Sequence, residues 1–222
     1  MITIGYIHTD FKEKFGIPRQ SNLVNDLKGQ ITFEKGYGQI EAFNGLEDFE
    51  YIWLLFGFNK SVKDKFCATV KPPRLGGNIK KGVFATRSPF RPNSIGLSSV
   101  KLDRIEYTKE KDVILHVSGV DILDNSPIYD IKPYLPYTDA HTNVRAGFTD
   151  SLVISPLDVS GLDLLNDIPI DKQQAIINAI KEDPRPGYQD DPSKVYKMAF
   201  DKWDIHFTIA NQVATIIKVI LL

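Results

Sequence analysis

The chain has 222 residues, 42% of them hydrophobic and 25% charged, with a net charge of −1. This length and composition predict one globular domain, or one domain with a small addition, and exclude a chain that is disordered throughout. The single cysteine, Cys67, excludes an internal disulfide and a zinc site built on cysteines. No segment reaches the ~20 apolar residues of a membrane span. We therefore expect no membrane association, no signal peptide, no bound metal and a reducing cytoplasm.

The first part of the chain alternates between short apolar segments and turns. Strands are expected at residues 2–8, 39–43, 51–58, 83–86, 95–102, 113–123 and 128–134. Residues 9–29 are polar and predict a long ordered loop. Residues 51–58 are apolar throughout, which predicts a strand buried on both faces. Many short strands between turns favour a closed or nearly closed β-barrel.

The pattern changes beyond residue 135. A helix is expected at 171–183, because Ala175, Ile176 and Ile180 share one face at helical spacing and Pro184 stops the helix. Closing strands are expected at 194–200, 203–209 and 213–222. The sequence therefore predicts a mainly β protein, with a small β-barrel domain over residues 1–138 and a small α+β domain over residues 139–222.

Positive charge is concentrated in one window. Residues 65–102 contain no Asp or Glu and hold eight of the 27 basic residues, which leaves 19 basic and 28 acidic residues elsewhere. Such a window creates a local field that attracts polyanions. The alternative interpretation is a solvated basic face.

Two segments combine a stiff backbone with planar donors. Pro18-Arg19-Gln20 places an arginine and a glutamine directly after a proline, whose φ is fixed. Arg87 and Arg91 stand in a loop that Pro89 and Pro92 stiffen, so these arginines lose little freedom when they bind a ligand. A guanidinium binds a carboxylate or a phosphate through two parallel hydrogen bonds. The alternative is that both arginines only brace their loop.

The third segment runs from residue 121 to residue 134. Asp130, Lys132 and Tyr134 are spaced by two, so they share one face of an extended chain. An acid, a base and an aromatic ring on one surface could act together in proton transfer. The alternatives are a plain turn at 124–127 and a surface ion pair worth less than ~1 kcal/mol.

The sequence resembles the TrmO-like (YaeB-like) family. The resemblance is carried by "KPPRLGGNIKKGVFATRSPFRPNSIGLSSVKL" and "DILDNSPIYDIKPYLPYTDA", and also by "EKFGIPRQ", "LEDFEYIWLLFGF" and "DPRPGY". Members are S-adenosylmethionine-dependent methyltransferases that methylate N6 of threonylcarbamoyladenosine next to the anticodon of tRNA, at position 37. The resemblance implies a barrel that carries the cofactor, a C-terminal appendage and a cytoplasmic homodimer.

The resemblance also implies a set of cofactor contacts. They are Pro18, Arg19, Gln20, Asn59, Lys60, Arg87, Leu97, Asp121, Ile122, Leu123 and Asp124. Asn59 and Lys60 stand where some members have His-Gln, and Ser94 stands where many have proline.

Roles follow from what the reaction needs. The N6 nitrogen is a poor nucleophile, so a base should accept its proton. Asp130 is the expected base, with Lys132 and Tyr134 as its orienting or electrostatic partners. Arg87 is expected to face the cofactor. The expected contacts with the tRNA anticodon loop are Lys71, Arg74, Lys80, Lys81 and Arg91.

Three other functions stay open at this point. The chain could be a methyltransferase of the same fold with another substrate, a non-enzymatic RNA-binding barrel, or a structural or regulatory dimer that binds the cofactor as a sensor.

Overall fold

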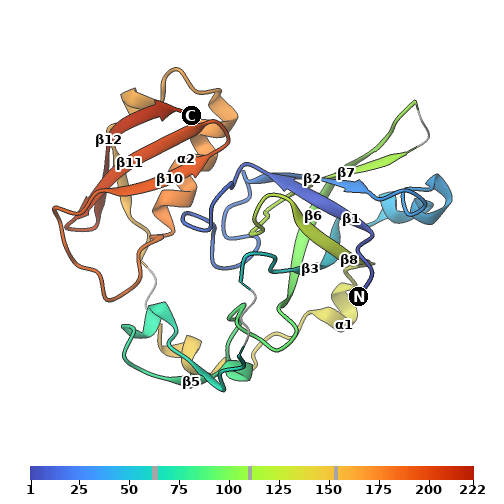
Figure 1. Ribbon diagram of the computed structural model, residues 1–222, viewed down its shortest axis with the longest axis horizontal. Helices are drawn as coiled ribbons and strands as arrows, with labels where there is room; N and C mark the ends of the chain where they lie inside the picture. The colour runs from blue at the N-terminus through green and yellow to red at the C-terminus, as the bar shows by residue number, and fades with distance from the viewer. Residues whose placement is uncertain (62–64, 110–111, 153–154) are drawn as a thin grey trace.

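Six strands close into a barrel. The computed structural model describes residues 1–61, 65–109, 112–152 and 155–222. The strand order around the barrel is β1-β2-β7-β6-β3-β8 (Figure 1). The strands are β1 Gly5–Thr9, β2 Lys28–Phe33, β3 Tyr51–Gly57, β6 Ile95–Tyr107, β7 Val113–Ser118 and β8 Ser126–Pro133. The mainly β fold with an N-terminal barrel that the sequence predicts is confirmed.

The barrel interior is filled by residues at alternating positions along each strand. Ile7, Ile31 and Ile128 have no exposed surface, as expected for side chains that point into a small barrel. The expectation that β3 is buried on both faces is wrong. Its burial alternates, with Ile52 inside and Trp53 partly exposed, as expected for a barrel strand with one face toward the interior.

A second sheet forms the C-terminal part. Its order is β10-β11-β12-β9, and β9 runs parallel to β12. The elements are β9 Asp158–Ser160, α2 Ile170–Lys181, β10 Tyr196–Phe200, β11 Trp203–Ala210 and β12 Val213–Leu221. The helix and the three closing strands are confirmed to within a few residues; β9 escaped prediction because a three-residue strand carries no periodic signal.

Short elements lie between the strands of these two sheets. They are the 3-10 helices η1 Ile40–Phe43, η2 Leu46–Asp48, η3 Pro73–Leu75, η4 Val83–Ala85, η5 Gly147–Ser151 and η6 Leu162–Leu165, the helix α1 Pro136–Asp139, and the paired strands β4 Thr69–Val70 and β5 Lys81–Gly82. The strands expected at 39–43 and 83–86 are therefore wrong. At η4, the hydroxyl of Thr86 donates to the carbonyl oxygen of Val83 (2.8 Å), and such local bonds compete with strand pairing.

The loop expected over residues 9–29 ends earlier, because β2 begins at Lys28. This strand lies between β1 and β7 and is needed to close the barrel. Gly29 faces inward, where a Cβ would lie only 3.1 Å from the Ile7 Cδ1 atom. A glycine and two charged or amide residues hid the strand pattern from sequence inspection.

The loop between β1 and β2 packs the barrel against the C-terminal sheet. Phe11 packs edge-on against Phe200, with ring centroids 5.3 Å apart, and Phe15 stacks on Tyr196 at 5.9 Å. Gly16 lies so close to Met198 that a Cβ would overlap its side chain. Buried residues of both parts consequently form one hydrophobic cluster.

An arm containing β4 and β5 projects from the barrel toward the chain segment around η5 (Figure 1). Lys81 lies over the ring of Phe148 at 5.8 Å from its centroid. Among the described helices, none is long and apolar enough to cross a membrane.

Candidate active site

A pocket of about 670 Å³ opens at one end of the barrel. Its volume lies in the range of pockets that hold small molecules. Three of the predicted regions meet there: the loop before β2, the segment after η4, and the turn after β7. The predicted residues that line it are Pro18, Arg19, Gln20, Asn59, Lys60, Arg87, Arg91, Leu97, Asp121 and Leu123.

The adjacent ends of β3 and β6 form the apolar wall of the pocket. Phe56 pairs with Gly96 across the two strands. The ring of Phe56 occupies the space that a Cβ at Gly96 would need, so a larger residue at position 96 would displace the ring from the wall. Leu97, which is 55% exposed, continues this wall toward solvent.

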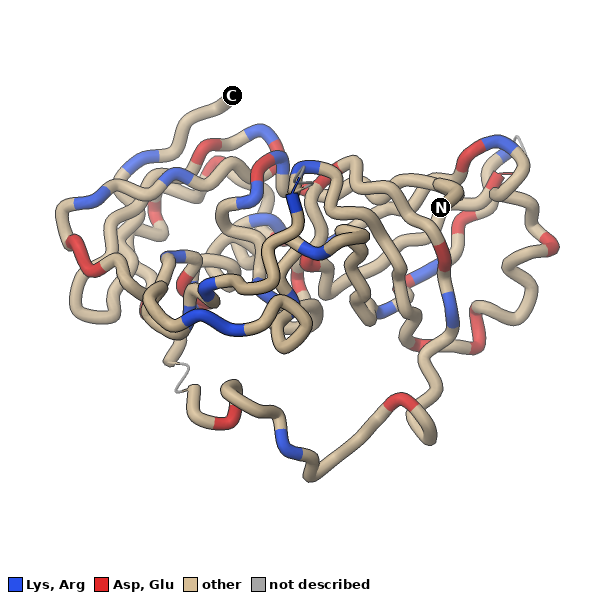
Figure 2. The backbone as a smooth tube through the Cα atoms, turned by 60° about the horizontal axis from the view of Figure 1, so that its bottom comes forward, with Lys and Arg blue, Asp and Glu red and all other residues tan. Residues whose placement is uncertain are grey.

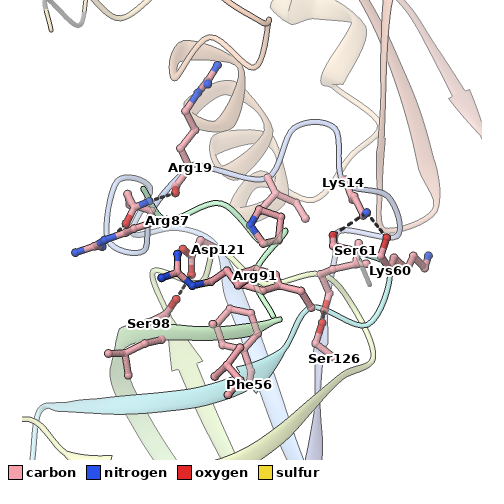
Figure 3. Close-up of a pocket in the computed structure, with 18 of the residues that line it drawn as sticks. Lys14, Arg19, Phe56, Lys60, Ser61, Arg87, Arg91, Ser98, Asp121 and Ser126 are labelled. Carbon is pink, nitrogen blue, oxygen red and sulfur yellow. Dashed lines mark hydrogen bonds between the residues drawn. The ribbon is translucent and has the colours of Figure 1, made fainter. Parts of the chain in front are cut away.

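Asp121 supplies a carboxylate inside the pocket (Figure 3). The hydroxyl of Ser98 donates to its Oδ1 atom over 2.7 Å. Burial raises the pKa of Asp121 above its ordinary value, although the Ser98 hydrogen bond and the charge of Arg87 pull it down. The pocket therefore holds an acid that keeps a proton to higher pH than an exposed aspartate.

Arg87 and the loop before β2 are joined by hydrogen bonds. The guanidinium of Arg87 donates to Oε1 of Gln20, and the amide nitrogen of Gln20 donates to the carbonyl oxygen of Arg19. This contact presents the arginine and the amide together at the pocket mouth.

Arg19 is one of the residues that line the pocket. Its guanidinium points toward α2 (Figure 3) and donates to the carbonyl oxygens of Arg185 (2.7 Å) and Asp183 (3.4 Å). Burial, together with the charge of Arg74, lowers the pKa of Arg19. A turn of the C-terminal part thus holds the loop that lines the pocket.

The turn after β7 divides its residues between two sides. Ile122 is buried and its carbonyl oxygen accepts from the hydroxyl of Thr9 (3.0 Å). The carboxylate of Asp124 accepts from Lys12 (2.8 Å) and from the N–H of Thr9 (2.9 Å). Burial alone would raise the pKa of Asp124, but these hydrogen bonds lower it below its ordinary value. Neither residue lines the pocket, so the structure places these two expected cofactor contacts outside it.

Another wall of the pocket is formed by residues of the loop that follows β3. Asn59 donates its amide to the carbonyl oxygen of Asn125 (3.0 Å), and Lys60 donates to the carbonyl oxygen of Lys12 (3.3 Å). Lys14 reaches across to the hydroxyl of Ser61 (2.9 Å). The side chains of Asn59 and Lys60 therefore form hydrogen bonds that hold neighbouring loops in place.

The expected catalytic residues lie elsewhere. Lys132 and Asp130 do share one face, since Lys132 Nζ lies 3.1 Å from Asp130 Oδ2. That face is the outer barrel wall, and none of the three residues lines the pocket. Tyr134 packs against Trp53 at 5.6 Å between ring centroids, and Trp53 lines the pocket, so the group stands beside it.

The expected RNA contacts spread over the arm. Lys71 and Lys80 are exposed. Arg74 lies 3.8 Å from Glu182. Arg91 donates to the carbonyl oxygens of Thr86 (2.8 Å) and Val83 (3.2 Å), so it braces its own loop as well as lining the pocket. Figure 2 shows basic residues on the chain segments near the arm.

Some lining residues were missed by sequence reasoning. They are Lys14, Ile17, Trp53, Phe56, Phe58, Ser61, Pro73, Thr86, Pro89, Ile95, Gly96, Ser98 and Ser126. Lys14 lies within "EKFGIPRQ", so the resemblance could have pointed to it. The sequence did not mark Ser98 as a site residue, because serines are common in strands that have no functional role.

Comparison with known proteins decides the family. The model of the tRNA-methyltransferase O N-terminal domain matches residues 6–140, and that of the TrmO C-terminal domain matches residues 161–221. The chain belongs to the TrmO family. The first match ends just past the barrel, and the second covers the C-terminal sheet apart from β9.

TrmO relatives of known name and structure cover nearly the whole chain. The tRNA (adenine(37)-N6)-methyltransferase of Escherichia coli K12 is 35% identical over 217 residues, which are 94% of this chain and 92% of the relative. A relative from Pseudomonas aeruginosa, whose name includes the words S-adenosylmethionine-dependent methyltransferase, is 38% identical over 92% of this chain and 90% of its own length. A crystal structure of TrmO from Pseudomonas aeruginosa superposes with a TM-score of 0.77 at 30% identity, covering 98% of this chain and 97% of that one.

Proposed function

We propose that this protein is an S-adenosylmethionine-dependent tRNA (adenine(37)-N6)-methyltransferase whose substrate base is threonylcarbamoyladenosine. The observation that carries this proposal is the meeting of Arg87, Gln20 and Asp121 in the lining of one pocket in a TrmO fold. These residues come from three distant parts of the sequence, and each was expected at the cofactor.

The residues of the pocket fit S-adenosylmethionine. Its carboxylate suits the guanidinium of Arg87. Its amine or ribose hydroxyls suit the carboxylate of Asp121. Its sulfonium cation and adenine ring suit the aromatic faces of Phe56 and Trp53. The cofactor supplies an electrophilic methyl group when bound.

The chain itself must align the target nitrogen and accept its proton. Alignment with the methyl group supplies much of the rate in such reactions. Asp121 lies inside the pocket, and its raised pKa makes it a stronger base than an exposed carboxylate. Asp130 stays a candidate for the proton acceptor from the sequence. Because it lies on the outer barrel wall, it could act only on an adenine ring held on the far side of Trp53 from the pocket.

The target adenosine must leave the anticodon-loop stack to enter the pocket, as with other enzymes that modify bases. Lys71, Lys80 and Lys81 belong to the arm and Arg91 lines the pocket, and these residues would hold phosphates. We propose in addition that the protein acts in the cytoplasm as a homodimer, as the resemblance implies; sedimentation of the purified protein tests the dimer.

The first experiment is transfer of radiolabelled methyl from S-adenosylmethionine to tRNA taken from cells that lack this protein. Nucleoside analysis should place the label on threonylcarbamoyladenosine. Label on another nucleoside, or on protein, would support a methyltransferase with a different substrate. Stoichiometric cofactor binding with no transfer to any RNA would support a sensor, and RNA binding without cofactor binding would support a plain RNA-binding barrel.

A further inference from the structure

Two phenylalanines on the arm are exposed together. Phe66 is 58% exposed and Phe84 is 71% exposed. Their rings stack on each other, with centroids 6.2 Å apart and planes inclined by 26°. Two large apolar rings that gather at the surface instead of entering the core mark a contact site for a partner.

A cation extends this stack toward the pocket. The guanidinium carbon of Arg91 lies 5.5 Å from the centroid of the Phe84 ring. Arg91 also lines the pocket. The aromatic pair is therefore connected to the pocket wall through one side chain.

Phe84 is held in a fixed place. It belongs to η4, whose turn is closed by the hydroxyl of Thr86 on the carbonyl oxygen of Val83 (2.8 Å). Val83 itself is buried, and Arg91 donates to the carbonyl oxygens on either side of Phe84 and Ala85. A ring anchored in this way loses little freedom when a flat ligand stacks on it.

We propose that the exposed aromatic pair of Phe84 and Phe66, which Arg91 connects to the pocket, stacks an unpaired base of the RNA next to the nucleotide that enters the pocket. This inference rests on the proposed function and adds the surface that receives the neighbouring nucleotide. When one base is extruded from a loop, its neighbours lose a stacking partner, and exposed aromatic side chains are the usual replacement in proteins that bind single-stranded nucleic acid.

Charge identifies the partner as RNA. The rings lie within the window of residues 65–102, which has eight basic residues and no acidic one. A phosphate chain that follows these basic residues would bring its bases over the rings. A second copy of this chain is the alternative occupant, and its presence there is an outcome that the test must detect.

The test measures binding of a fluorescent anticodon stem-loop, containing the modified adenosine, by anisotropy. Phe84→Ala should weaken binding roughly tenfold, the order expected when one base–aromatic stack is removed, and Phe66→Ala should weaken it less. Phe84→Trp should bind as the wild type does. Tyr107→Ala is the matched control, because Tyr107 is 49% exposed at the other end of β6 and should change nothing.

Two further measurements identify stacking. The slope of log affinity against log salt should stay the same in Phe84→Ala, since no phosphate contact is lost. Replacing the base next to the modified adenosine with an abasic sugar, on one side and then the other, should abolish the effect of Phe84→Ala in one of the two RNAs. Such loss of additivity shows that the ring and the base interact directly.

Each contrary result has a separate meaning. If the wild type and Phe84→Ala bind the stem-loop equally, the stacking proposal is wrong while the methyltransferase proposal stands. If Phe84→Ala changes the sedimentation coefficient, a second copy covers the rings and the stacking proposal is again wrong. If the wild type neither binds nor methylates the RNA, both proposals fall.

Discussion

Asp121 is held in a place that disfavours its charge. Because burial raises its pKa above the ordinary 3.8, the folded protein binds a proton at Asp121 more tightly than the unfolded chain does. Stability consequently falls as pH rises from the ordinary value through the raised one, and the loss remains at neutral pH. A carboxyl group in a pocket whose pKa is raised by burial is a candidate functional residue.

We predict that Asp121→Asn lowers the rate of methyl transfer about 100-fold or more, because it removes the proposed proton acceptor. The same variant should unfold at an equal or higher temperature at neutral pH, because the buried charge is gone. Asp130→Asn is the matched comparison: its ion pair with Lys132 is exposed, so its effect on stability should stay below ~1 kcal/mol. Activity lost in Asp130→Asn and kept in Asp121→Asn would assign the proton acceptor to the outer wall.

At the scale of single elements, the loop before β2 depends on the turn at residues 183–186. Arg19 is its attachment. We predict that Arg19→Ala weakens S-adenosylmethionine binding, measured by calorimetry, and lowers the free energy of unfolding by about 1–3 kcal/mol, because two carbonyl oxygens lose their partner. Arg19→Lys should restore part of both, since its ammonium still donates. A variant with full affinity for the cofactor would show that the loop holds its shape unaided.

The basic residues of the arm should divide into two groups. We predict that Lys80→Ala lowers the salt dependence of RNA binding by about one phosphate contact, because the side chain is exposed and forms no ion pair with the residues that the structure describes. Arg74→Ala should change the slope less, because Arg74 already faces Glu182 at 3.8 Å. Titrations at several salt concentrations measure both slopes, and equal effects would mean that the Arg74–Glu182 pair opens when RNA binds.

Strands with alternating or continuous apolar residues could be predicted from the sequence, and turns formed by local hydrogen bonds could not. Strand β3 and helix α2 were found because their patterns are long. Segment 83–86 looks like a strand by composition, yet Thr86 closes a 3-10 turn through its own hydroxyl. Strand β2 could not be predicted from the sequence, because its extended conformation is stabilised by pairing with β1 and β7 and not by the pattern of its own residues.

The candidate site shows the same division. Motifs placed Arg87, Gln20 and Asp121 in one pocket, but they could not say where a side chain points. Asp124 turns to Lys12, and Arg19 turns to the C-terminal turn. Spacing by two correctly put Asp130 and Lys132 on one face, but spacing alone cannot tell the inner from the outer wall of a barrel.

At the scale of the whole molecule, Lys172 ties helix α2 to two other segments. Its Nζ lies 2.7 Å from Oδ1 of Asp10 and 2.9 Å from Oδ2 of Asp201. Burial alone would lower the pKa of Lys172, but the two carboxylates raise it above the ordinary 10.5. The stabilisation is therefore complete below the ordinary lysine value and is lost as pH rises through the raised value.

We predict that Lys172→Met unfolds at lower denaturant concentration than the wild type at neutral pH. The difference should stay constant into the alkaline range and shrink as pH rises past 10.5. Denaturant titrations at several pH values measure it. A difference that is the same at every pH would mean that the packing of the lysine stem, and not its charge, supports the contact.

The loop that lines the pocket also places Phe11 and Phe15 in the core of the C-terminal sheet. The loop between β1 and β2 therefore lines the binding site and also packs between the barrel and the C-terminal sheet. The packing of the N-terminal part thus depends on residues of the C-terminal part. Removing the C-terminal part would expose the rings of Phe11 and Phe15 and would also loosen the pocket. The pocket is therefore expected to keep its shape only while both parts of the chain are present.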